Sequence, residues 1–268
     1  MKGKLPLWEE VDNSLRRKIK FLGDYLKSLG PLCVSISGGI DSGFLLFMAK
    51  MVTDDVIAVH ISSPFHRGKD AENVASWVGV DFFPVYIDLL SFKDIRENGR
   101  FRCYYCKREM YRKIKEVAGD RVVLDGSNMD DLDDFRPGMR ALSELGIKSP
   151  LIDMGFYKKE IREAARFFNI PFWDKPSDSC LATRIPHGFE IKEEILKRVY
   201  NAESFLLSLG FKTVRVRDYG NLAKIEVGRD ELEKAFAMRD FIADTFKTMG
   251  YESVSLDLKG YRGRSVDD

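Results

Sequence analysis

The stretch that decides the fold of this chain is LCVSISGGIDSGFLLFMAKM, residues 32–51. Residues 32–36 predict a short apolar strand, and residues 43–51 predict an apolar helix. The turn between them contains Ser37, Gly38, Gly39, Asp41 and Ser42. Glycines let the backbone approach an anion closely, serines add hydroxyl donors, and the N–H groups at the start of the helix point at the anion. The pattern is typical of phosphate binding.

Asp41 is unusual in such a turn, because a carboxylate beside a phosphate needs a cation between them. Mg²⁺ prefers carboxylate and phosphate oxygens, so the pattern favours Mg²⁺. The turn lacks the Gly-Lys-Ser/Thr ending of a Walker A loop and the spacing of the dinucleotide-binding motif. It resembles the PP-loop of the ATP pyrophosphatase superfamily. The plainer alternative is an ordinary glycine-rich turn between a strand and a helix.

Composition indicates a balanced, cytoplasmic protein. The chain has 268 residues, of which 44% are hydrophobic and 32% charged, with a formal net charge of +1. A core of useful size is expected, and nothing in the overall charge favours nucleic acid. We expect no membrane association, since no apolar run reaches transmembrane length and residues 1–10 lack the pattern of a signal peptide.

Apolar, β-prone runs alternate with helical stretches over the first two thirds of the chain, which predicts an α/β fold with a doubly wound parallel sheet. Strands are expected at residues 32–36, 56–61, 82–87 and 121–124, and helices at residues 11–29, 43–51, 69–77, 106–117 and 158–168. From residue 188 the expected order is a helix at 190–209, strands at 211–217 and 222–227, a helix at 230–249 and a strand at 251–258. We therefore expect a domain at 1–187 and a small α+β domain at 188–268.

Three of the four cysteines are candidate metal ligands. Cys103 and Cys106 stand three residues apart at a predicted helix start, and Cys180 lies far along the chain. Three thiolates suit a cubane iron–sulfur cluster with one open iron. A dithiol redox pair, unrelated thiols and a zinc site remain alternatives, the last completed by one of the histidines His60, His66 and His187. Cys33 is expected in the core.

Two further groups follow predicted strands. The segment 125–138 contains Gly126 and several acids, and it should emerge at the same sheet edge as the PP-loop. It suits nucleotide or metal binding, or alternatively a solvated capping loop. Ser62 and Ser63 follow the second strand and are candidates to line an adenine pocket.

Arg215 and Arg217 alternate with valines, so both should project from one face of a strand. Paired guanidinium groups suit a phosphate. The alternative is an exposed polar face on which the arginines pair with Asp218 or Glu226.

Together these segments resemble the LarE family of ATP-dependent sulfur transferases, which build the nickel-pincer nucleotide cofactor. The resemblance covers nearly the whole chain. It includes the PP-loop and the segments 125–138, 173–176, 180–186 and 214–217, of which residues 173–186 are the most specific part.

The resemblance implies that ATP adenylates a carboxylate of a pyridinium-3,5-dicarboxylate mononucleotide, and that sulfur then displaces AMP. It implies ATP and Mg²⁺ as cofactors, a small nucleotide as substrate and a homo-oligomer. Cys103 and Cys106 beside Cys180 indicate the type of member with a 4Fe-4S cluster, although a route that sacrifices the Cys180 sulfur remains open. By resemblance, substrate phosphate would be bound by Arg184, Arg215 and Arg217, and Glu203 and Glu226 would lie at the rim of the active site.

The sequence is also compatible with three other functions. A PP-loop enzyme that thiolates tRNA also uses cysteines and a cluster, but the near-neutral charge argues against a tRNA surface. An amide-forming synthetase would need no set of three cysteines. A nucleotide-sensing protein would bind ATP without releasing pyrophosphate.

Overall fold

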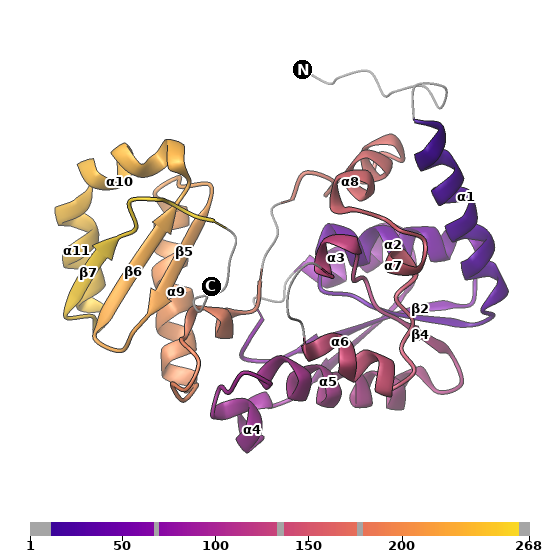
Figure 1. Ribbon diagram of the computed structural model, residues 1–268, viewed down its shortest axis with the longest axis horizontal. Coiled ribbons are helices and arrows are strands. Elements are labelled where there is room, and N and C mark those ends of the chain that lie inside the picture. The colour runs from indigo at the N-terminus through magenta and orange to yellow at the C-terminus, as the bar shows by residue number, and fades with distance from the viewer. Residues whose placement is uncertain (1–11, 67–69, 133–136, 176–178, 263–268) are drawn as a thin grey trace. The chain divides into compact units, whose positions relative to one another are not determined.

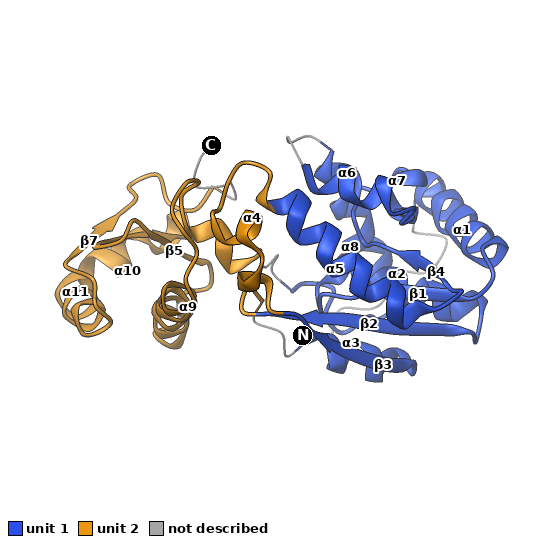
Figure 2. Cartoon of the chain, turned by 90° about the horizontal axis from the view of Figure 1, so that it is seen from below, with its two compact units in different colours: residues 1–63, 67–87, 103–178 blue, residues 64–66, 88–102, 179–268 orange. Residues whose placement is uncertain are grey.

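The computed structural model describes residues 12–66, 70–132, 137–175 and 179–262. Within these residues, every helix is too short or too polar to cross a membrane. The chain forms two compact units (Figure 2). Unit 1 comprises residues 1–63, 67–87 and 103–178, and unit 2 comprises residues 64–66, 88–102 and 179–268. Unit 2 thus includes residues 64–66, 88–102 and 179–187, which the expected boundary between residues 187 and 188 assigns to the first domain.

Unit 1 is built on a parallel sheet, as expected. Its strands are β1 (Leu32–Ser35), β2 (Val56–Ser62), β3 (Asp81–Tyr86) and β4 (Val122–Leu124). The order is β3-β2-β1-β4, and every pairing is parallel. Because β1 lies between β2 and β4, the segments that follow these three strands emerge beside one another at one edge of the sheet.

Helices cover both faces of this sheet. They are α1 (Asn13–Ser28), α2 (Ile40–Val52), α3 (Asp70–Val78), α5 (Arg102–Ala118), α6 (Pro137–Glu144), α7 (Pro150–Asp153) and α8 (Lys158–Phe167). Figure 1 shows α1, α2 and α8 on one face and α5 and α6 on the other. The short helices α6 and α7 were not predicted, and α5 begins before the expected residue 106, so that it includes Cys103.

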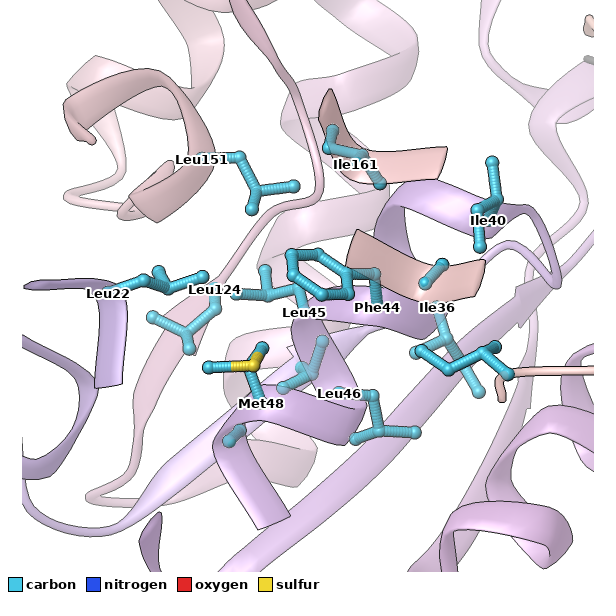
Figure 3. Close-up of a cluster of buried hydrophobic side chains, with 14 of the residues drawn as sticks. Leu22, Ile36, Ile40, Phe44, Leu45, Leu46, Met48, Leu124, Leu151 and Ile161 are labelled. Carbon is cyan, nitrogen blue, oxygen red and sulfur yellow. The ribbon is translucent and has the colours of Figure 1, made fainter. Parts of the chain in front are cut away.

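The core of unit 1 lies between the sheet and helices α1, α2 and α8. Figure 3 shows that Phe44, Leu45 and Met48 of α2 lie among Leu22 of α1, Leu124 of β4 and Ile161 of α8. Phe44 and Leu45 are fully buried. The PP-loop precedes this buried helix, so packing of α2 fixes where the loop ends.

Unit 2 contains a three-stranded sheet. Its elements are α4 (Lys93–Arg96), α9 (Glu193–Ser208), β5 (Val214–Asp218), β6 (Leu222–Val227), α10 (Leu232–Ala237), α11 (Arg239–Thr248) and β7 (Ser253–Leu256). The sheet order is β5-β6-β7, with β5 antiparallel and β7 parallel to β6. The predicted hairpin and final strand are confirmed.

The single helix expected at residues 230–249 is wrong. Met238 leaves helical geometry, with φ −97° and ψ 9°, and separates α10 from α11. The break lets Ala235 of α10 and Ile242 and Phe246 of α11 reach the same buried cluster. Tertiary packing therefore overrides a sequence pattern that is compatible with one long helix.

We predict that Phe44→Ala lowers the free energy of unfolding by about 3–5 kcal/mol, because it removes a fully buried ring from a close-packed core. Met51→Ala, in the same helix but 62% exposed, should change it by less than about 0.5 kcal/mol. Urea titrations followed by circular dichroism measure both. Equal losses in the two variants would contradict this description of α2.

Candidate functional site

The PP-loop is closed by its own serines. The backbone N–H of Ser37 donates to Ser42 Oγ at 3.2 Å, and the N–H of Gly39 donates to Ser37 Oγ at 3.3 Å. Gly38 has φ +81°, and a Cβ there would lie 2.8 Å from the backbone nitrogen of Ala71 in α3. The loop needs glycine at this position for both its backbone conformation and its close packing.

Asp41 lies in the first turn of α2, where its two carboxylate oxygens differ. Lys158 Nζ donates to Oδ2 at 2.8 Å. Oδ1 is buried and has no hydrogen-bond partner among the described residues. A carboxylate oxygen that lacks a partner beside a phosphate-type loop fits the chemistry of a Mg²⁺ ligand.

The turn after β4 packs directly against the PP-loop. A Cβ on Gly126 would lie 2.9 Å from both the nitrogen and the Cα of Ser42. The two segments therefore meet at one edge of the sheet, as expected from their places after neighbouring strands. Asn128 and Asp131 cap the short 3₁₀ helix Met129–Asp131, which confirms the capping interpretation for these two residues. Residues 133–136 of the same motif lie outside the described residues.

Asp125 links this turn to the cysteine-bearing helix α5. It accepts a hydrogen bond from Tyr111 Oη at 2.8 Å and from the N–H of Ser127 at 2.9 Å. Lys107 Nζ lies 3.6 Å from Asp125 Oδ2. Burial alone would raise the pKa of Asp125, but Lys107, Ser127 and Tyr111 favour the ionised form and the net pKa is lowered. Asp125 is therefore a buried carboxylate held charged beside the PP-loop.

The serines that follow β2 occupy the neighbouring part of the sheet edge. Ser62 is the last residue of β2, and its carbonyl accepts a hydrogen bond from Ile87 at 3.0 Å. Ser63 is buried. Their proposed part in an adenine pocket stays a prediction.

The four cysteines occupy different environments. Cys33 is fully buried in β1, as predicted, and burial raises its pKa to about 12. Cys103 is exposed and Cys106 half-buried in the first turn of α5 of unit 1, whereas the half-buried Cys180 belongs to unit 2. Among the described residues, no group of three or more His, Cys, Asp or Glu side chains stands ready to hold a metal. The three-thiolate set suits a 4Fe-4S cluster in its donor chemistry, and the cluster stays a prediction.

The three arginines named from the sequence gather in unit 2 with two glutamates. Arg184 donates two hydrogen bonds to Glu203 at 3.0 and 3.1 Å, and Arg217 donates two to Glu226 at 3.1 and 3.2 Å. The structure confirms the pairing of Arg217 with Glu226. Arg215 and Arg217 are both buried, so the exposed face that we considered for them is wrong.

These arginines also hold the segment that carries Cys180. Arg184 donates to the carbonyl oxygens of Ser179 and Cys180 at 2.7 and 3.0 Å. Arg217 donates to the carbonyl of Thr183 at 2.9 Å, and Arg215 donates to Ser179 Oγ. The Cys180 backbone is therefore fixed by a buried, charge-assisted network, which limits where its thiol can lie.

Sequence reasoning did not assign roles to Lys107, Lys158 and Lys175. Lys175 Nζ donates to the carbonyl oxygen of Gly38 at 3.0 Å and also contacts Asp70. The sequence did point to Lys175, because it lies in the segment 173–176, part of the most specific stretch of the family resemblance. Residues 176–178 lie outside the described residues. Lys158 gave no local signal, because its partner Asp41 is 117 residues away along the chain.

Comparison with known proteins finds relatives that match almost the whole chain. A Synechocystis protein of uncharacterized function is 34% identical over 94% of this chain and 98% of its own length. A Methanocaldococcus jannaschii protein, also uncharacterized, is 35% identical over 94% and 96%. The pyridinium-3,5-bisthiocarboxylic acid mononucleotide synthase of Lactiplantibacillus plantarum is 33% identical over 91% of each chain. No protein-family profile matches.

We predict that iodoacetamide at pH 8 alkylates Cys103 at least about ten-fold faster than Cys33 in the reduced, metal-free protein. The thiolate is the reacting form, and Cys33 is buried with a raised pKa whereas Cys103 is exposed. Peptide mass spectrometry of timed samples measures both rates. Comparable rates would contradict the placement of Cys33 in the core.

We predict that Asp125→Asn removes part of the acid sensitivity of folding. Because the pKa of Asp125 is lowered in the folded chain, its contribution is fully present above the unfolded-state value of about 4 and is lost as the pH falls below it. The wild type should lose more free energy of unfolding than the variant between about pH 5 and pH 3. Urea titrations across this range measure the free energy of unfolding of both proteins. An equal loss in the wild type and the variant would contradict the lowered pKa of Asp125.

Proposed function

We propose a sulfur-transfer function on one premise: this chain belongs to the LarE family, the family of the pyridinium-3,5-bisthiocarboxylic acid mononucleotide synthases. The match along 91% of the chain to the L. plantarum synthase carries the proposal. The enzyme would convert a carboxylate of pyridinium-3,5-dicarboxylate mononucleotide to a thiocarboxylate at the expense of ATP. The PP-loop at the end of β1 supports this activity, because its glycines, with Gly38 at φ +81°, lead directly into the N-terminus of α2, an arrangement that suits phosphate binding.

In the first step a carboxylate oxygen of the substrate attacks the α-phosphorus of ATP. The bond from phosphorus to the bridging oxygen breaks, and pyrophosphate leaves with that electron pair. N–H groups of Gly38 and Gly39 and the hydroxyls of Ser37 and Ser42 would bind the departing pyrophosphate. Asp41 would hold Mg²⁺, which neutralises phosphate charge when bound.

In the second step a sulfur nucleophile attacks the acyl carbon, and the carbon–oxygen bond to AMP breaks. The step changes no oxidation state when sulfide is the nucleophile. Cys103, Cys106 and Cys180 would hold a 4Fe-4S cluster, which supplies an open iron to bind sulfide. This route allows repeated turnover, whereas donation of the Cys180 sulfur itself would leave dehydroalanine.

The buried charged cluster of unit 2 suits recognition of the phosphate of the substrate. Arg184, Arg215 and Arg217 already place guanidinium groups around the Cys180 segment. Glu203 and Glu226 each hold one of them in orientation through two hydrogen bonds. A phosphate bound there would bring the substrate close to the Cys180 thiol.

The setting we propose for this activity is a cytoplasmic homo-oligomer that acts on a small nucleotide. The alternative function is thiolation of tRNA by the same PP-loop chemistry. Filter binding of tRNA at moderate salt separates them, since phosphate contacts give steep salt dependence. We expect no specific retention of tRNA.

We predict that Asp41→Asn lowers AMP and pyrophosphate formation by about 100-fold or more. The variant removes the carboxylate charge proposed to hold Mg²⁺, and loss of the metal's charge stabilisation raises the barrier by several kcal/mol. Asp54→Asn, an exposed carboxylate just after α2, is the matched control and should retain activity. Both products are measured with the dicarboxylate substrate and ATP. Unchanged pyrophosphate release by Asp41→Asn would reject the role of Asp41.

We predict that the mass of the chain is unchanged after one turnover of the reconstituted, anaerobic protein supplied with sulfide. Loss of the mass of hydrogen sulfide, about 34 Da, from the peptide that contains Cys180 would instead show conversion to dehydroalanine. That result would contradict the cluster route and leave the adenylation step intact. A Cys33→Ser variant, which alters only the core thiol, controls for nonspecific desulfurisation.

A further inference from the structure

Two lysines from distant parts of unit 1 lie on the PP-loop. Lys158 begins α8, and its Nζ donates to Asp41 Oδ2 at 2.8 Å. Lys175 follows α8 by several residues, and its Nζ donates to the carbonyl of Gly38 at 3.0 Å and contacts Asp70. Each lysine side chain retains 30% of its exposure. Both cations therefore reach the loop and remain accessible to a ligand.

The surroundings of the loop place these cations where an anion would be bound. The N-terminus of α2 lies at the loop, and the start of α3 packs against Gly38. The backbone N–H of Lys158 is itself fixed, because it donates to Asp130 Oδ2 at 2.6 Å. The lysine stem is thus anchored at its base, while its flexible chain lets Nζ move between acceptors.

The present partners of both lysines are acceptors that phosphate oxygens can replace. Asp70 is exposed, with 59% of its side-chain surface accessible, and the Gly38 carbonyl is part of the loop itself. Asp41, the partner of Lys158, is the carboxylate proposed to hold Mg²⁺. Mg²⁺ bound at Oδ1 of Asp41 would offset part of the charge of the carboxylate that Lys158 contacts through Oδ2, which favours a further anion beside the lysine.

We propose that Lys158 and Lys175 bind the β- and γ-phosphates of ATP and retain the pyrophosphate that leaves. The inference rests on the proposed function and extends it to two residues outside the PP-loop. Cations at this position stabilise the charge that develops on the leaving group, while the α-phosphorus stays open to the carboxylate. They interact with ATP and pyrophosphate, and not with AMP.

The test compares three ligands. Isothermal titration of the full chain in magnesium chloride gives Kd values for ATP, pyrophosphate and AMP in the wild type, Lys158→Gln and Lys175→Gln. Each variant should bind ATP and pyrophosphate about ten-fold or more weakly, since each loses a charge-assisted hydrogen bond, and should bind AMP within about two-fold of the wild type. Lys159→Gln, the exposed neighbour of Lys158, is the matched control and should match the wild type for all three ligands.

Charge-retaining variants guard against a general loss of structure. Lys158→Arg and Lys175→Arg should recover most of the affinity for pyrophosphate, and thermal melting should be alike across the series. Unchanged ATP affinity in both Gln variants, or equal weakening of ATP and AMP, would overturn the assignment while the proposed function stands. A wild type that binds AMP but neither ATP nor pyrophosphate would overturn both.

Discussion

The approach of Gly126 to Ser42 is the contact on which the arrangement of unit 1 depends. A Cβ on Gly126 would lie 2.9 Å from the backbone of Ser42, so a side chain does not fit there without a shift. The contact joins the turn after β4 to the start of α2, and it places Asp125 beside the PP-loop. Through Lys107, Asp125 also fixes α5, the helix that begins with the cysteine pair. The PP-loop and the cysteine pair are thereby positioned by one short network.

The buried charges of unit 2 serve a comparable purpose for Cys180. Taking arginines and glutamates out of water is costly, and their pairing only partly offsets the cost. What the cluster provides is orientation: Arg184 spans Glu203 and the carbonyl of Cys180, so the thiol-bearing segment is tied to α9. The proposed transfer of sulfur to an activated acyl group before water arrives would require such fixed geometry.

Much of the fold was predictable because short apolar runs alternate with helical patterns. The four parallel strands, the hairpin of unit 2 and the burial of Cys33 are confirmed. The break at Met238 was missed, since it depends on packing that local periodicity does not encode. The short helices α6 and α7 were missed as well.

The candidate site was predictable where residues are close in sequence and missed where they are not. The PP-loop serines and glycines were recognised from a single turn, and the segment after β4 from strand order. Lys158 and Asp41 meet only through the packing of α8 on α2, so nothing local indicated their contact. The burial of Arg215 and Arg217 was not predicted, because alternation in a strand does not tell which face is covered.

The central claim, that ATP activates a carboxylate and sulfur then displaces AMP, is tested most directly by following the oxygen atoms. The substrate is prepared with isotopically heavy oxygen in its carboxylates and incubated with ATP, sulfide and the reconstituted enzyme. If the acyl adenylate forms, one carboxylate oxygen remains on phosphorus when AMP departs, so the account predicts AMP that carries the heavy oxygen. Thiocarboxylate formed together with unlabelled AMP would contradict it.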